Sequence, residues 1–150
     1  MDRLTGGDVA CWVIKSALPP AALDRTWAPG GTRELNRCLR ASYRLELMAP
    51  GQPCLLWLSG RDRPGVHGHG ILTGVPDSAD GGTEIAVRLT LLEAPILRSE
   101  LLVDPTARDA EVLRMPAGSN PSWLSGRQYA AVLARLGRRD RDAGLGPWTP

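Results

Sequence analysis

The sequence predicts an α+β domain built on a curved, mixed, mostly antiparallel β-sheet or small barrel that is flanked by helices. Three observations lead to this prediction. The 150-residue chain is 43% hydrophobic and 23% charged, which suits a single domain with its own core. Several short segments have strand composition and several have helical composition. The two kinds do not alternate as they do in a parallel α/β sheet, and no internal repeat is present.

The first predicted strand covers residues 9–14, "VACWVI", which are rich in β-branched and aromatic side chains. This strand ends at Lys15 and Ser16, and Lys15 is the only lysine among the 18 lysine and arginine residues. The next segment, "LPPAALDR", carries prolines at positions that suit a first helical turn. One or two turns of helix are therefore expected before the Gly/Pro-rich segment "TWAPGGT".

Residues 33–44, "RELNRCLRASYR", contain no glycine or proline, and Leu35 and Leu39 are four positions apart. This spacing predicts an amphipathic helix with one apolar side. The arginines of the segment follow helical spacing on another side. They form a predicted basic stripe of Arg33, Arg37, Arg40 and Arg44, for which a solvated helix face is the alternative explanation.

Three further strands are predicted in the middle of the chain. Residues 54–59, "CLLWLS", form a continuous apolar run that is typical of a central strand covered on both faces. Residues 66–75, "VHGHGILTGV", follow as the second strand of a hairpin, where Gly68 and Gly70 predict a bulge or a close approach. Residues 84–97 alternate between apolar and smaller or polar side chains, as an extended strand does.

The last third of the chain is predicted to be mainly helical. Residues 101–115, "LLVDPTARDAEVLRM", predict a short strand or extended piece and then a helix that opens at the proline. Ser125 and Gln128 form an S-x-x-Q capping box in front of "YAAVLARL". Gly137 is placed to end that helix.

Composition excludes several classes of protein. No apolar run is long enough for a membrane span and the first residues lack a signal-peptide pattern, so we expect a cytoplasmic protein with no membrane partner. The three cysteines show no CxxC spacing, so no disulfide is expected. His67 and His69 would share one face of a strand and allow two metal ligands. Because no third ligand is evident, we expect no metal and no cofactor.

Trp27 lies in a Gly/Pro-rich loop shortly after Lys15 and Ser16. A tryptophan in such a loop either covers the core or offers a flat surface on which a ligand stacks. Taken alone, each of these residues has an ordinary structural explanation. The order in which they occur is more specific than any one of them.

This order resembles the EVE and YTH branch of the PUA-like superfamily. The resemblance rests on "WVIKS", on a tryptophan after a short helix and loop, on "LN" in a basic segment, and on "LLWLSG" followed by "PGVHGHGIL". It covers residues 9–136 and implies one EVE/PUA-like domain over residues 1–137 with a C-terminal tail at 138–150. YTH proteins read N6-methyladenosine, so the resemblance implies a curved sheet with a pocket for one nucleobase that is flipped out of its strand.

The resemblance also implies roles for individual residues. Lys15 would contact a backbone phosphate, Ser16 would line the base pocket, and Trp27 would form the wall on which the base stacks. The basic stripe would follow the flanking phosphates. The second aromatic wall is missing from its expected loop, and Trp57 and Trp123 are the candidates to replace it. The other implied pocket residues are Ala28, with its carbonyl near the base edge, and Asn36, at the rim or holding the loop.

Two departures from these relatives leave the base identity open. YTH readers carry asparagines shortly after Lys-Ser, where this chain has Ala17 and Ala21. EVE domains commonly continue with Glu-Pro, where this chain reads Ala-Leu-Pro. Adenine recognition through those asparagines is therefore not expected here.

The leading functional prediction is a non-enzymatic reader of a modified, for example methylated, base in DNA or RNA. One alternative is a ribonuclease similar to ASCH domains, in which Lys15 would stabilise the charge on phosphorus and a histidine or Tyr43 would move protons. Another alternative is a pocket for a small-molecule nucleoside that uses no polymer. For that case the arginines of the stripe would not affect ligand affinity.

Overall fold

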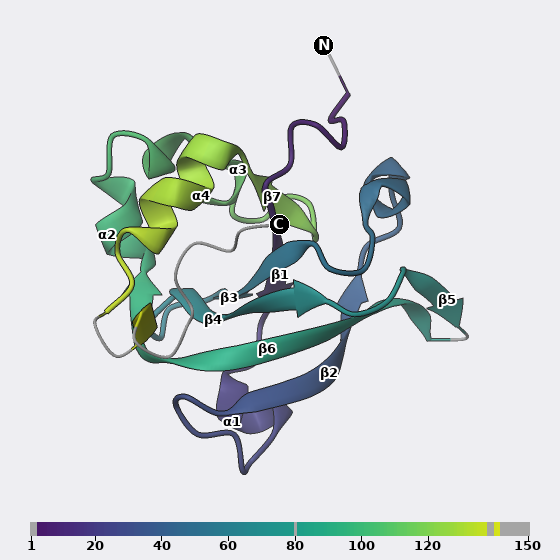
Figure 1. Cartoon of the computed structure of the whole chain (residues 1–150), viewed down its shortest axis with the longest axis horizontal. Coiled ribbons are helices and arrows are strands. Elements are labelled where there is room, and N and C mark those ends of the chain that lie inside the picture. The colour runs from purple at the N-terminus through teal and green to yellow at the C-terminus, as the bar shows by residue number, and fades with distance from the viewer. Residues whose placement is uncertain (1–2, 80, 138–139, 142–150) are drawn as a thin grey trace.

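The computed structural model describes residues 3–79, 81–137 and 140–141. It contains a seven-stranded mixed sheet with the order β2-β6-β4-β3-β1-β7, in which β5 pairs with β6 (Figure 1). The helices α2 (Arg98–Leu102), α3 (Glu111–Arg114) and α4 (Gly126–Leu133) gather on one side of this sheet, whereas α1 (Pro20–Leu23) lies on the other side. The predicted α+β class with a curved, mostly antiparallel sheet is confirmed. None of the described helices is long and apolar enough to cross a membrane.

The centre of the sheet is formed by β1 (Cys11–Ser16), β3 (Pro53–Leu58) and β4 (Gly65–Leu72). β1 and β3 are parallel, and β3 and β4 form the predicted antiparallel hairpin. β7 (Ser122–Leu124) pairs antiparallel with the other edge of β1. The prediction of β3 as a central strand is confirmed, since it has a neighbour on each side.

The longest strand, β6 (Gly82–Leu97), pairs with β4, with β2 and with β5 (Asp77–Ala79). Gly70 of β4 lies so close to β6 that an added Cβ would stand 1.8 Å from the Arg88 carbonyl oxygen. The predicted close approach is therefore confirmed at Gly70. β4 also contains a register shift between Val66 and Gly68, as the bulge prediction expected.

The predicted helix over residues 33–44 is wrong. These residues form the strand β2 (Thr32–Leu39), which pairs along its whole length with β6, and then the 3-10 turn η1 (Tyr43–Leu47). Residues alternate between exposed and half-buried along β2, so its odd-numbered residues face inward. Eight consecutive pairs in a ladder outweigh the helical preference of the individual residues.

The C-terminal third differs from its prediction at more than one place. The helix expected to open at Pro105 is divided into a 3-10 turn and a short α-helix, and the strand β7 was not predicted. Where a strand or extended piece was expected, β6 leads into α2 (Arg98–Leu102), followed by η2 (Ala107–Asp109) and α3 (Glu111–Arg114). The predicted short helix of one or two turns is confirmed as α1 (Pro20–Leu23). The prediction that Gly137 ends the last helix is wrong, because α4 (Gly126–Leu133) already ends at Leu133 with Ala134 as its C-cap.

The capping box at the start of α4 is confirmed. Its two bonds are Gln128 N to Ser125 Oγ at 3.2 Å and Ser125 N to Gln128 Oε1 at 3.0 Å. Most of the predicted tail at 138–150 lies outside the described residues. Of this segment, Asp140 is buried and its Oδ1 accepts a bond from Glu93 N of β6.

Two apolar cores lie on opposite faces of the sheet. The first fills the space between the sheet and the helices α2, α3 and α4, and it includes Cys11 and Val13 of β1. The second lies on the other face and includes Trp12 and Ile14. Because side chains alternate along a strand, β1 contributes to both cores. This alternation decides how the candidate site is arranged.

Candidate functional site

The candidate site lies where the parallel strands β1 and β3 end. In the register of this pair, Lys15 stands beside Trp57 and Ser16 beside Leu58. The amide of Ser59 then donates to the Ser16 carbonyl at 2.9 Å and so holds the two chain ends together. Lys15 shares its face of the sheet with Trp57, whereas Ser16 shares the opposite face with Trp12 and Ile14. The structure therefore divides the predicted pocket between two faces of one strand end.

A pocket of about 450 Å³ opens on the Lys15 side of this strand end. We call it the Trp57 pocket. Its volume is within the range of small-ligand sites. Trp57 itself is only 3% exposed, so only a small part of its indole faces the pocket. The pocket is lined by Trp57, Ser59, Gly60, Pro64, Arg98, Pro116 and Ala117.

Lys15 lies beside this pocket. Its Nζ donates to the carbonyl oxygen of Pro116, a pocket residue, at 3.1 Å. Burial lowers the pKa of Lys15, while Glu111 acts in the opposite direction. The predicted position of a cation at the end of a core strand is thus present, and the ammonium lies next to an open cavity.

The hydroxyl of Ser16 is fully engaged within the protein. It donates to Leu18 O at 2.7 Å, and it accepts from Leu18 N at 3.1 Å and from Arg37 Nη2 at 3.2 Å. One donor and two acceptor sites are all that a serine hydroxyl has. Ser16 is also 3% exposed, so it supports its neighbours and does not face a cavity.

Trp27 packs into the second core and is 5% exposed. Its Nε1 donates to the Gly31 carbonyl at 2.8 Å, which closes the loop between α1 and β2. Ala28, the next residue, is exposed in the same loop. In this structure the indole covers the core, which is the first of the two roles that a loop tryptophan can have.

Asn36 and Trp123 are not brought to the strand end. Asn36 is exposed on β2, on the face opposite Arg37. Trp123 pairs with Trp12, four residues along β1 from Ser16, which corresponds to about 13 Å at the rise of an extended strand. Of the two candidates for a second aromatic wall, only Trp57 therefore lies beside Lys15.

The four arginines of the predicted stripe have different partners. Arg33 Nε pairs with Asp24 at 3.0 Å, and Arg44 forms a two-bond pair with Glu111 at 2.6 and 2.8 Å. The hydrogen bonds from Arg44 lower the pKa of Glu111. Within residues 3–79, 81–137 and 140–141, Arg37 and Arg40 have no carboxylate partner.

The two histidines contact separate groups. His67 Nε2 lies 2.7 Å from the Arg63 carbonyl, and His69 Nε2 lies 2.8 Å from the Tyr129 hydroxyl in the interior. Burial lowers the pKa of His69 to about 4. Among the described residues there is no cluster of three or more potential metal ligands.

Sequence reasoning missed Asn120, which joins β1 to the edge strand β2. Its Oδ1 accepts from Lys15 N at 3.0 Å, and its Nδ2 donates to Lys15 O at 3.4 Å and to Cys38 O at 3.2 Å. Arg40 N donates to the Asn120 carbonyl at 2.8 Å. One side chain thus bridges β1 and the end of β2. Asn120 is 105 positions from Lys15, and no local signal in the sequence links the two.

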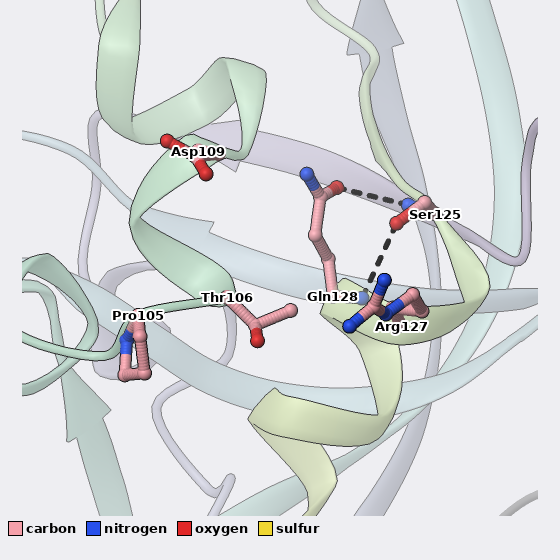
Figure 2. A pocket seen from close by; sticks show the side chains of 6 residues that line it. All are labelled: Pro105, Thr106, Asp109, Ser125, Arg127 and Gln128. Atoms are coloured by element: carbon pink, nitrogen blue, oxygen red, sulfur yellow. Dashed lines mark hydrogen bonds between the residues drawn. The ribbon is translucent and has the colours of Figure 1, made fainter.

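Two other described pockets are less suited to an anionic polymer. Figure 2 shows the one between η2 and α4, of about 230 Å³, where the Ser125 and Gln128 side chains are already bonded in the capping box. The other lies between η1 and the β5 segment, measures about 370 Å³ and has no basic residue in its lining. The Trp57 pocket is larger than either. Its lining contains Arg98 and no acidic residue, whereas the lining of the Figure 2 pocket contains Asp109 as well as Arg127.

Comparisons with known proteins identify the fold. No family model matches the chain, and no curated protein matches it. A crystal structure of a Pseudomonas putida protein superimposes with a TM-score of 0.62 at 16% identity, covering 83% of this chain and 98% of that one. A hypothetical protein from Leishmania major gives 0.61 at 15% identity, with 85% and 94% covered.

The DUF55 domain of human thymocyte nuclear protein 1 superimposes with a TM-score of 0.57 at 15% identity, covering 83% of this chain and 96% of that domain. Another structure of the human protein is a complex with DNA that contains 5-methylcytosine. It gives a TM-score of 0.46 at 13% identity, with 93% and 99% covered. The first three superpositions confirm the curved-sheet fold that the resemblance to the EVE branch implied.

Proposed function

We propose that this chain, which has the fold of the DUF55 or EVE domain, binds nucleic acid and holds one flipped, modified base without cleaving the strand. The observation that carries the proposal is the Trp57 pocket. An open cavity of about 450 Å³ there combines the exposed part of an indole and two prolines with Arg98, next to the ammonium of Lys15. Flat apolar walls suit a base, and cations beside them suit its phosphates.

The energies are of the right size for a base that leaves its stack. Extruding a base costs a few kcal/mol, and contact with aromatic walls recovers about 1 to 3 kcal/mol per base. A methyl group on the base adds about 0.8 kcal/mol when it is buried. Because Trp57 exposes only a small part of its indole, Pro64 and Pro116 would have to supply the rest of the stacking surface. The discrimination between modified and unmodified bases is therefore expected to be less than tenfold if the methyl group alone provides it.

The test fills the pocket. Ala117→Trp would place an indole in the cavity, and Ala130→Trp adds the same group on the exposed side of α4 as a matched control. Binding is measured by fluorescence anisotropy with single-stranded and mismatched duplex probes, in DNA and RNA, that carry cytosine, 5-methylcytosine, adenine or N6-methyladenine. The 5-methylcytosine probe is included because the human protein has been solved with such DNA.

We expect Ala117→Trp to lose at least tenfold in affinity and Ala130→Trp to bind like the parent chain. A parent chain that binds none of the probes at low salt would overturn the proposal. Equal binding by both tryptophan variants would show that the Trp57 pocket is not the site that holds the base. Cleavage of a labelled RNA probe during the incubation would contradict the non-enzymatic part.

A small-molecule nucleoside is the second candidate ligand, and one observation favours it. Two of the four arginines expected to follow phosphates, Arg33 and Arg44, are held in internal ion pairs. A free nucleoside needs no phosphate contacts, so its affinity would be independent of salt. Competition between a methylated mononucleoside and the labelled oligonucleotide, repeated at two salt concentrations, separates the two candidates.

A further inference from the structure

Arg37 carries a positive charge that no carboxylate neutralises in the part of the chain that the structure describes. It lies half-buried on the inner face of β2, and its Nη2 donates to Ser16 Oγ at 3.2 Å. Its Nε is buried and has no acceptor among the described residues. A buried charged donor without a partner is costly, so this group is poised for an acceptor that is not part of the chain's own contacts.

The other three arginines of the predicted stripe do not share this combination of burial and missing acidic partner. Arg33 lies four positions earlier on the same face of β2 and is paired with Asp24. Arg44, in η1, is paired with Glu111. Arg40 is exposed, where water can solvate its charge. Arg37 is thus the one arginine of the predicted stripe that is half-buried without an acidic partner among the described residues.

The place of Arg37 relates it to the candidate site. It bonds to Ser16, and the adjacent Lys15 reaches the rim of the Trp57 pocket on the opposite face of β1. The end of β1 therefore has one cation on each face. A strand of nucleic acid that lies across this end, with one base in the Trp57 pocket, would bring a neighbouring phosphate toward Arg37.

We propose that Arg37 binds a backbone phosphate next to the base in the Trp57 pocket, and that Ser16 is the positioning residue for Arg37. This inference rests on the proposed function. A phosphate is favoured over a base edge because a neutral edge would leave the buried charge uncompensated. In a guanidinium, Nε–H and one N–H of the neighbouring Nη form a fork that fits two phosphate oxygens. Nη2 has two N–H groups, so it can keep Ser16 and still complete this fork.

Ser16 acts through Arg37 because its own hydroxyl has no bonding capacity left. The sequence resemblance placed Ser16 in the base pocket. The hydrogen bonds of Ser16 instead favour Arg37 as the residue that contacts the nucleic acid directly. Ser16 then orients the Arg37 guanidinium.

The experiment measures affinity as a function of salt for Arg37→Gln, with Arg127→Gln on the exposed first turn of α4 as the matched charge control. Each phosphate contact contributes about 0.7 to 0.9 to the slope of log K against log salt. We expect Arg37→Gln to reduce the slope by about this amount and to weaken modified and unmodified probes equally. Arg127→Gln should leave the slope unchanged.

Two further variants test the geometry. Arg37→Lys keeps the charge and loses the fork, so we expect the slope to remain while affinity falls severalfold. Ser16→Ala should weaken binding in the parent chain but not in the Arg37→Gln background, because it acts only through that arginine. Thermal melting of each variant verifies that it is folded.

The outcomes separate this inference from the proposed function. A parent chain that binds no probe refutes the proposed function. A parent chain that binds, with an unchanged slope in Arg37→Gln, refutes only the role of Arg37. If Arg37→Gln does not fold, wild-type affinity in Arg37→Lys would still overturn the bidentate contact.

Discussion

The buried His69 predicts that the protein loses stability as the pH falls from 7 to 5. Burial lowers the pKa of His69 to about 4, from an ordinary value of 6.5. Between these values the unfolded chain takes up a proton on this ring and the folded chain does not. Falling pH therefore favours unfolding, and the stability is fully present only above the unfolded pKa.

The size of the effect follows from the two pKa values. At about 1.4 kcal/mol per pH unit, the full effect is about 3 kcal/mol, and about 2 kcal/mol of it falls between pH 7 and pH 5. Three acidic groups with shifted pKa values act outside this pH range. Asp24, Asp104 and Glu111 have pKa values below their ordinary ones, so the stability they provide is lost only at lower pH.

The assay is urea unfolding followed by tryptophan fluorescence at pH 7, 6 and 5. The parent chain should lose about 2 kcal/mol over this range, whereas His69→Gln should show a nearly flat profile at whatever stability it has. His67→Gln, whose ring contacts the Arg63 carbonyl at the surface, is the matched control and should keep the slope. If the free energy of unfolding of His69→Gln still falls by about 2 kcal/mol from pH 7 to pH 5, His69 is not the cause of the pH dependence.

Three further predictions concern the packing around the candidate site. Gly70→Ala should lower the free energy of unfolding by about 3 kcal/mol or more, since the added methyl group would collide with the Arg88 carbonyl. A midpoint of urea unfolding that hardly changes would contradict this prediction. Glu111→Gln should lower the free energy of unfolding by about 3 kcal/mol in chemical denaturation, because it leaves the charge of the Arg44 guanidinium uncompensated. This loss should be smaller in the double variant that also carries Arg44→Met. Asn120→Ala should lower the free energy of unfolding by about 2 kcal/mol and speed up hydrogen exchange of the Lys15 amide, from which the Asn120 side chain accepts a hydrogen bond. Unchanged exchange of this amide would show that the bridge adds no stability.

The strands with a clear apolar pattern were predictable, and β2 was not. Its Leu35 and Leu39 are four positions apart, which fits a helix, but Arg33, Leu35, Arg37 and Leu39 also alternate with a period of two. Arginine hides this second pattern, since its aliphatic stem can face a core while its charge finds a partner. The partners Asp24 and Ser16 are distant in sequence or on another strand, so the local pattern could not show them.

The candidate site was predictable only in part, for a geometric reason. Lys15 and Ser16 are consecutive residues of a strand, so their side chains face opposite ways and cannot line one wall. Trp57 reaches the Lys15 side through the parallel pairing of β1 and β3, which no local pattern announces. The pocket residues Arg98 and Pro116 come from segments that follow "PGVHGHGIL" in the chain and carry no sharp motif of the resemblance.

The bridge made by Asn120 and the pairing of β1 with the neighbouring strand β7 both form late in synthesis of the chain. β1 gains its second neighbour only when Ser122–Leu124 has been translated, more than a hundred residues later. Until then, β1 is an apolar strand with one unpaired edge, and another nascent polypeptide could pair with that edge. Ribosome-bound chains that stop before residue 115 should therefore be held by a chaperone more strongly than chains that include β7, and equal capture would contradict this view.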